Sequence, residues 1–197
     1  TDPEAVAGGV DIADGTLVLA LNGSFRPTGP ISLSPGATLE VRGTNGELIL
    51  PPESSLNGEI ELNESSRLTV QSDQASDTFV AGRVIGGSRL YLSGPGSWEL
   101  GTVGSGVILE VDGGGDLTVN GPWTSRSVQI NGGRLIGSAA YPLQLGGIFD
   151  GQGDAVLQFA DGDYLNFAYL RNTATVDPGG DAPAVVEFKE FWIIGDT

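Results

Sequence analysis

The 197-residue sequence contains no cysteine and no histidine. Without cysteine the chain forms no disulfide and offers no thiolate as a nucleophile or a metal ligand. Without histidine it lacks the most frequent general base in enzymes and a common zinc ligand. Acid–base chemistry would therefore have to rely on carboxylates, with arginine as an electrostatic partner. We expect no enzyme here.

Basic residues are scarce, and helix signals are missing. The formal net charge of −16 would repel a phosphate backbone, so the sequence predicts no nucleic-acid partner. No segment approaches the roughly 20 consecutive apolar residues of a membrane-spanning helix, so we expect no membrane insertion of this segment. No window places apolar residues at i, i+3, i+4 and i+7 over the length that a helix needs, and glycine or proline interrupts the chain often.

The sequence does contain a short recurring unit in which two apolar residues are separated by a single intervening residue. Such a period of two is typical of a strand with one dry face and one wet face. Aromatic residues make up only 7%, so the dry face is mainly aliphatic. The unit recurs in the pairs Leu39/Val41, Leu48/Leu50, Ile60/Leu62, Leu68/Val70, Leu90/Leu92, Trp98/Leu100, Leu109/Val111, Leu117/Val119, Val128/Ile130, Leu143/Leu145, Leu157/Phe159 and Leu165/Phe167.

The spacing of the turns favours a solenoid over hairpins. Glycine-rich corners at residues 93–96, 112–115, 131–133 and 150–153 begin 19 residues apart. A coil that stacks on its predecessor needs such a constant interval, whereas a meander of hairpins does not. Two series of apolar residues recur at intervals near 19 to 21 residues, or near twice that where Phe79 and Val80 fill the gap less cleanly. We expect the third side of each coil to be a variable loop. One series contains Leu39, Ile60, Trp98, Leu117, Leu135 and Leu157, and the other contains Leu48, Leu68, Leu90, Leu109, Val128, Leu145 and Leu165.

The predicted fold is all-β, a right-handed parallel β-helix with about 20 residues per coil. Residues 1–16 are expected to form an N-terminal cap and residues 17–170 the solenoid. Residues 171–197 are expected to hold a loop at 173–183 and then an apolar strand at 185–194 that caps the solenoid or forms an interface.

Residues 115–137 read GDLTVNGPWTSRSVQINGGRLIG, and looser copies lie at 88–111 and 133–159. This unit resembles the autotransporter-associated β-strand repeat of bacterial passenger domains. The resemblance implies a right-handed β-helix displayed outside the cell, with a role in adhesion or aggregation.

Calcium is the one cofactor for which the sequence provides candidate ligands. Asp112, Asp150, Asp154, Asp161 and Asp163 lie in Asp–Gly surroundings that faintly resemble the calcium-binding repeats of β-rolls. The alternative is that these aspartates simply satisfy the geometry of turns. Two coils would separate Asp112 from Asp150 by roughly 10 Å, too far to share one ion.

A carbohydrate site is the alternative to a purely structural role. Tyr91, next to Arg89 on an outward face, and Trp123 in a loop could stack on sugar rings. Trp98 is expected to point into the core. Outward charged residues could supply a carboxylate pair or a carboxylate with an arginine, although a solvated sheet surface explains them as well. These charged residues are Glu59, Glu61, Glu99, Glu110, Arg67, Arg89 and Arg134.

The sequence therefore predicts a structural or adhesive segment of a secreted or cell-surface solenoid. Its expected partners are a surface glycan, a matrix protein, or another copy of itself through the terminal strands. The alternative is a carbohydrate-binding or carbohydrate-active β-helix of the lyase or tailspike type, which requires charged groups converging in a groove beside an exposed aromatic ring.

Overall fold

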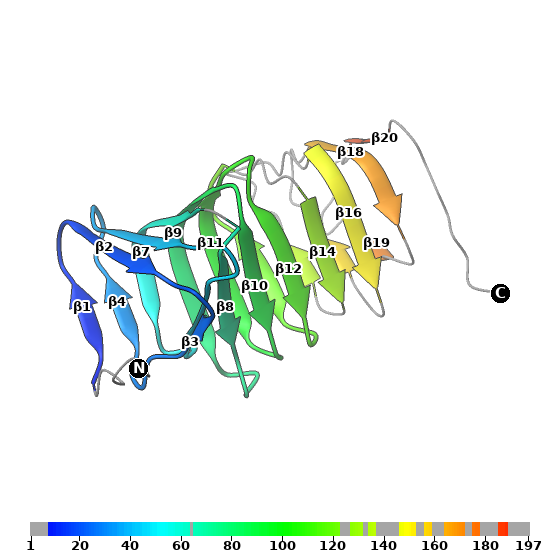
Figure 1. Cartoon of the computed structure of the whole chain (residues 1–197). Helices are drawn as coiled ribbons and strands as arrows, with labels where there is room; N and C mark the ends of the chain where they lie inside the picture. Colours follow the sequence, from blue (N-terminus) through cyan, green and yellow to red (C-terminus); the bar gives the residue numbers. More distant parts are fainter. Residues whose placement is uncertain are drawn as a thin grey trace.

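The chain is an all-β solenoid in which consecutive coils stack as parallel strands, as the sequence predicts. Figure 1 shows the strands lying side by side in one stack that begins at β1 and reaches β18 and β20. The computed structural model describes residues 8–63 and 65–122, and then the strands at 127–131, 134–136, 146–152, 156–158, 164–171, 175–177 and 185–188. No helix occurs in these ranges, in agreement with the missing helical periodicity.

Two parallel sheets form the sides of the stack, and neighbouring strands in each sheet come from successive coils. Sheet A consists, from one end to the other, of β1 (Val10–Ile12), β4 (Ile31–Leu33), β7 (Ser55–Leu62), β9 (Thr78–Gly86), β11 (Ser97–Val103), β13 (Asp116–Val119), β15 (Arg134–Ile136), β17 (Val156–Gln158) and β19 (Thr175–Asp177). In the same sheet, β2 (Thr16–Ala20) pairs with β5 (Thr38–Arg42), and β5 pairs with β7. Sheet B consists of β3 (Ser24–Phe25), β6 (Glu47–Leu50), β8 (Arg67–Gln71), β10 (Arg89–Ser93), β12 (Ile108–Asp112), β14 (Ser127–Asn131), β16 (Gly146–Gln152), β18 (Tyr164–Arg171) and β20 (Val185–Phe188).

The predicted period is confirmed by the register of the strands. In sheet B, Leu90 pairs with Leu68 on one side and with Leu109 on the other, and Leu109 pairs with Val128. Successive coils lie roughly 21 residues apart. Because the register is parallel, residues of like character come to lie on top of one another, and each aliphatic pair extends into a column inside the stack.

The core consists of these inward columns. In sheet A, Trp98 lies between Phe79 and Leu117 in register, and all three side chains are fully buried. Trp98 thus points inward, as predicted. Its indole Nε1 is the one buried side-chain polar atom without a hydrogen-bond partner in the described part of the chain. The ring therefore stabilises the core mainly through its large apolar area.

The first predicted apolar series combines two different columns, and this part of the prediction is wrong. Leu39 pairs with Ile60, but Ile60 pairs with Val84, whereas Trp98 pairs with Phe79. The reason is that β7, β9 and β11 are long strands that continue around a bend. Their second halves, together with β2 and β5, form strands on the third side of the coil, where a variable loop was expected.

The second series and the last glycine corner also differ from the prediction. Ser93, Asp112 and Asn131 stack as predicted, but Asn131 pairs with Gln152 and not with Asp150. In the backbone register Val128 pairs with Phe149 and Phe149 with Leu170, so the ladder does not connect Val128 with Leu145 or Leu165. Leu165 pairs with Val186, and Leu145 lies outside the described residues. One coil is two residues longer here, which a fixed 19-residue interval could not anticipate.

The ladders also extend beyond the predicted coils at both ends. Within the segment expected to be an N-terminal cap, β1 pairs with β4 in sheet A. Within the predicted loop at 173–183, β19 pairs with β17. The predicted terminal strand is present at Val185–Phe188, where it pairs in parallel with β18.

Glycines at the bend of sheet A allow the coils to approach closely. A Cβ atom built on Gly82 would lie 2.2 Å from the carbonyl oxygen of Asn57 in the coil before it. A Cβ on Gly101 would lie 2.0 Å from the carbonyl oxygen of Gly82. Real Cβ atoms do not approach backbone oxygens so closely, and the backbone of a stacked coil cannot move aside. Glycine is therefore required at this corner.

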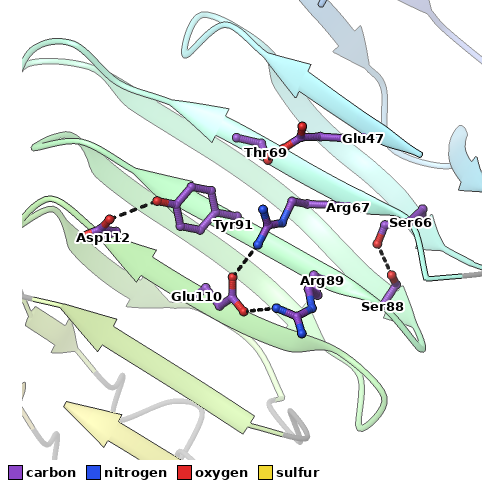
Figure 2. A network of polar contacts seen from close by, with 9 residues as sticks. All are labelled: Glu47, Ser66, Arg67, Thr69, Ser88, Arg89, Tyr91, Glu110 and Asp112. Atoms are coloured by element: carbon purple, nitrogen blue, oxygen red, sulfur yellow. Dashed lines mark hydrogen bonds and ion pairs between the residues drawn. The ribbon is translucent and has the colours of Figure 1, made fainter. Parts of the chain in front are cut away.

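Buried serine hydroxyls in the turns before sheet B donate hydrogen bonds to backbone carbonyls of the preceding coil. The buried Ser66 Oγ donates a hydrogen bond to the carbonyl oxygen of Val41 at 2.8 Å. One coil further on, the buried Ser88 Oγ donates to the carbonyl oxygen of Ser66 (Figure 2). Both carbonyl groups also accept a backbone N–H from the following coil, Val41 from Asn63 and Ser66 from Arg89. The serine hydroxyls therefore add a second hydrogen bond to each carbonyl, and each buried hydroxyl has an acceptor.

We predict that Gly101→Ala destabilises the chain because its methyl group would press on the Gly82 carbonyl. The expected loss is about 1–3 kcal/mol of the free energy of unfolding, measured by chemical denaturation. The matched control is Gly87→Ala, where a Cβ atom meets no atom within 4 Å and φ lies outside the left-handed region. The control should change stability by less than about 1 kcal/mol. Equal effects of the two substitutions would contradict the tight stacking at this corner.

Candidate functional site

The outward face of sheet B carries a network of polar contacts (Figure 2). Alternation in β8, β10 and β12 sends their leucines and valines into the core and their polar residues outward. The register then places Arg67 next to Arg89, and Tyr91 next to Glu110. We call this surface the polar face. It consists of Glu47, Arg67, Thr69, Arg89, Tyr91, Glu110 and Asp112 (Figure 2).

One carboxylate serves two arginines at the centre of the polar face. Arg67 Nη2 lies 2.9 Å from Glu110 Oε2, and Arg89 Nη1 lies 2.6 Å from Glu110 Oε1. The Glu110 side chain is only 17% exposed, whereas those of Arg67 and Arg89 are 36% and 51% exposed. The carboxylate therefore lies beneath two partly solvated guanidinium groups and is held by charge-assisted hydrogen bonds on both oxygens.

Tyr91 belongs to the same cluster. The Arg67 guanidinium lies over its ring, 5.1 Å from the centroid, at the separation of a cation–π contact. Its hydroxyl donates a hydrogen bond to Asp112 Oδ2 at 3.1 Å. Burial raises the pKa of the Tyr91 hydroxyl, and the hydrogen bond to Asp112 and the negative charge of that carboxylate raise it further. Tyr91 thus has one ring face covered and its hydroxyl engaged.

Glu47 forms the opposite end of the polar face. Thr69 Oγ1 donates a hydrogen bond to Glu47 Oε1 at 2.7 Å, and Ser24 Oγ donates to Glu47 Oε2 at 2.7 Å. Burial alone would raise the pKa of Glu47, but these hydrogen bonds, together with the positive charges of Arg67 and Arg26, lower it below its ordinary value. These interactions therefore favour the charged form of the Glu47 carboxylate.

Two of the residues predicted to bind carbohydrate, Arg89 and Tyr91, are engaged within the polar face. Arg89 pairs with Glu110, and Tyr91 lies under Arg67 rather than beside a free Arg89. Both lie on the side of a sheet, among groups that satisfy one another. Trp123 lies outside the described residues.

The predicted calcium ligands occupy different columns where they are described. Asp112 stacks with Ser93 and Asn131, whereas the backbone of Asp150 pairs with Gln129, in the column of Glu110. Within the ranges that the structure covers, no three carboxylates gather as a metal site. Asp154, Asp161 and Asp163 lie outside those ranges, so the prediction that they bind calcium stays a prediction.

The remaining charged candidates are spread over sheet A. Glu61 accepts a hydrogen bond from Asn63 Nδ2 at 3.0 Å, and Glu99 is exposed on β11. The backbone of Arg134 pairs with Asp116 and Val156, and its side chain is outside the described set. Glu59 forms an ion pair with Arg83 in the next coil.

The Glu59–Arg83 pair lies in a shallow groove that the sequence reasoning missed. Its volume is about 430 Å³, within the size range of small-molecule sites. The groove follows the bend of sheet A and is formed by segments of three successive coils. It is lined by Pro35, Gly36, Ala37, Thr38, Asn57, Gly58, Glu59, Gly82 and Arg83. Glycine at the same place in the consecutive strands β7, β9 and β11 is the sequence signal that could have indicated it.

Comparisons of the chain with protein-family models, with curated proteins and with solved structures found no match. A search of the described residues for a helix long and apolar enough to cross a membrane found none.

We predict that Glu110→Gln lowers the free energy of unfolding by about 1 kcal/mol, because it leaves Arg67 and Arg89 adjacent without a shared anion. The loss should depend on ionic strength, since both arginines are partly solvated. Glu99→Gln, an exposed position on the other sheet, is the control and should have a smaller effect. The measurement is urea denaturation at low and high salt. A loss for Glu110→Gln no larger than that of the control would contradict the shared ion pair.

A second prediction concerns pH. Because the pKa of Glu47 is lower in the folded chain than its ordinary value of 4.5, the unfolded chain binds more protons on acidification. The stabilisation by Glu47 is then fully present above pH 4.5 and is lost as the pH falls through the folded pKa. The difference in stability between the wild type and Glu47→Gln, followed by denaturation at several pH values, should therefore shrink on acidification. A difference that stays constant or grows would contradict this assignment.

Proposed function

We propose that this chain is a structural and adhesive segment of a secreted or cell-surface β-solenoid, of the kind found in autotransporter passengers. The observation that carries the proposal is the continuous parallel register of both sheets, from β1 to β19 and from β3 to β20. Each coil is hydrogen-bonded to the next along its strands, so the stack can hold its two ends apart as a stiff spacer.

The chemistry of the polar face supports a non-catalytic role. Its carboxylates are used to anchor arginines, hydroxyls and a tyrosine within the face. A catalytic acid or base needs a partner in a concave site, whereas these groups lie on the side of a sheet and engage one another. The complete absence of histidine and cysteine from the sequence points in the same direction.

The expected partners are a surface glycan, a matrix protein or another copy of the chain. With a net charge of −16, copies repel one another at low ionic strength. Salt screens this repulsion, with a Debye length of about 8 Å at physiological ionic strength. Self-adhesion should therefore increase with salt, whereas a charge-driven contact with a basic partner should weaken.

An adhesion assay with coated microbeads tests the proposal. Beads that carry the full chain should clump, or attach to surfaces coated with matrix proteins or polysaccharides, more than beads coated with an inert protein of similar charge. A salt series then separates self-adhesion from attachment to a basic partner. Beads that neither clump nor attach above the control at any salt concentration would overturn the proposal.

A second candidate function, carbohydrate binding, is favoured by the groove at the bend of sheet A. Thr38, Asn57, Glu59 and Arg83 supply donors and acceptors there, and the ion pair leaves little net charge. Such a lining suits a neutral, hydroxyl-rich ligand better than an ionic or an apolar one.

A glycan array followed by titration calorimetry tests this candidate. Arg83→Ala should reduce binding of a neutral oligosaccharide at least tenfold. Arg42→Ala, at an exposed position outside the groove, should leave binding unchanged. Failure of the wild-type chain to bind any glycan on the array would overturn the candidate, as would equal binding by the two variants.

A further inference from the structure

The sequence contains five Asn–Gly pairs, and the fold treats them very differently. They begin at Asn22, Asn45, Asn57, Asn120 and Asn131. Asn–Gly is the dipeptide most prone to spontaneous loss of the side-chain amide, because glycine has no Cβ to hinder attack by its own backbone nitrogen. Attack requires that nitrogen to reach the asparagine side-chain carbonyl, so local packing decides which pair reacts.

In three of these pairs the glycine is buried against the preceding coil. A Cβ on Gly46 would lie 2.8 Å from the carbonyl oxygen of Leu21, and one on Gly58 would lie 2.2 Å from that of Ala37. A Cβ on Gly121 would lie 2.7 Å from the carbonyl carbon of Gly101. The N–H of Gly46 also donates to the carbonyl oxygen of Gly43 at 3.1 Å. These glycines cannot shift toward the asparagine without opening the stack.

The pair at Asn22 and Gly23 is different. Both residues are exposed, in the turn between β2 and β3, and a Cβ on Gly23 would meet no atom within 4 Å. The flanking groups are anchored, since Leu21 N–H donates to the Arg42 carbonyl at 2.8 Å and Glu47 N–H donates to the Gly23 carbonyl at 3.0 Å. The turn itself faces solvent, where water can supply the base and the hydrolytic water. Of the fifth pair, Gly132 lies outside the described residues.

We propose that Asn22 is a site of self-modification, at which the folded chain deamidates to aspartate and isoaspartate while Asn45, Asn57 and Asn120 are protected. The Gly23 backbone nitrogen loses its proton to solvent base and attacks the Asn22 side-chain carbonyl carbon. A carbon–nitrogen bond forms in a succinimide ring, the bond to the side-chain nitrogen breaks, and ammonia leaves. Water then opens the ring at either carbonyl, so the net change consumes water and releases ammonia without any oxidant or reductant.

The modification has structural consequences at the first coil. Ser24 Oγ donates to Glu47, so a new carboxylate at residue 22 places negative charge two residues from an existing carboxylate contact. Isoaspartate also adds one atom to the backbone between the two anchoring hydrogen bonds of Leu21 and Gly23. The pairing of β3 with β6 should then weaken, and this end of the stack should open more readily.

Mass spectrometry of the full chain tests the proposal. The folded protein is incubated at mildly alkaline pH below its unfolding temperature, and peptides are mapped for aspartate and isoaspartate at each Asn–Gly pair. Asn22 should react at least about tenfold faster than Asn45, Asn57 or Asn120. In denaturant the four rates should become similar, which shows that the fold causes the difference.

Two variants sharpen the result. Asn22→Gln should abolish the early modification, because its longer side chain places the carbonyl less favourably for ring closure. Asn45→Gln is the matched control and should leave the rate at Asn22 unchanged. Similar rates at Asn22 and the other three pairs in the folded chain would overturn the proposal, as would a rate at Asn22 far below that of the unfolded chain.

Discussion

The structure depends on one constraint, the parallel register that makes each coil the template for the next. Backbone hydrogen bonds between coils fix the height of every residue, with neighbouring strands about 4.8 Å apart. At that spacing the bend of sheet A has no room for a Cβ atom, which explains why Gly82 and Gly101 stand on top of each other. The same spacing brings Phe79, Trp98 and Leu117 into one continuous apolar column.

The parallel register is unfavourable for some charged residues, because it places side chains of the same charge next to each other in adjacent strands. Arg67 and Arg89 lie in adjacent strands at the same height, an arrangement that is unfavourable by itself. Glu110 in the next strand offsets it by bonding to both, and Tyr91 places a ring beneath Arg67. The polar face is therefore explained by the needs of the stack.

Alternation and spacing were enough to predict the coils, since Ser93, Asp112 and Asn131 stand in register as expected. The bend within β7, β9 and β11 could not be predicted, because a glycine inside a strand looks the same in sequence as one that ends it. The members of the polar face could be named, but not their partners: Glu110 joins Arg67 from two coils away, a contact 43 residues distant in sequence. The groove was missed because it is formed by segments of three coils, residues 35–38, 57–59 and 82–83, that are far apart in the sequence.

Disulfide cross-linking tests the register most directly, because the chain has no cysteine of its own. Glu99 and Thr118 pair in register on the outward side of sheet A, at a separation that a disulfide can span. The double substitution Glu99→Cys/Thr118→Cys should form an intramolecular disulfide on oxidation. Glu99→Cys/Gln129→Cys, which joins positions on different sheets, should not. Cross-linking of the second pair but not the first would contradict the stacked parallel coils.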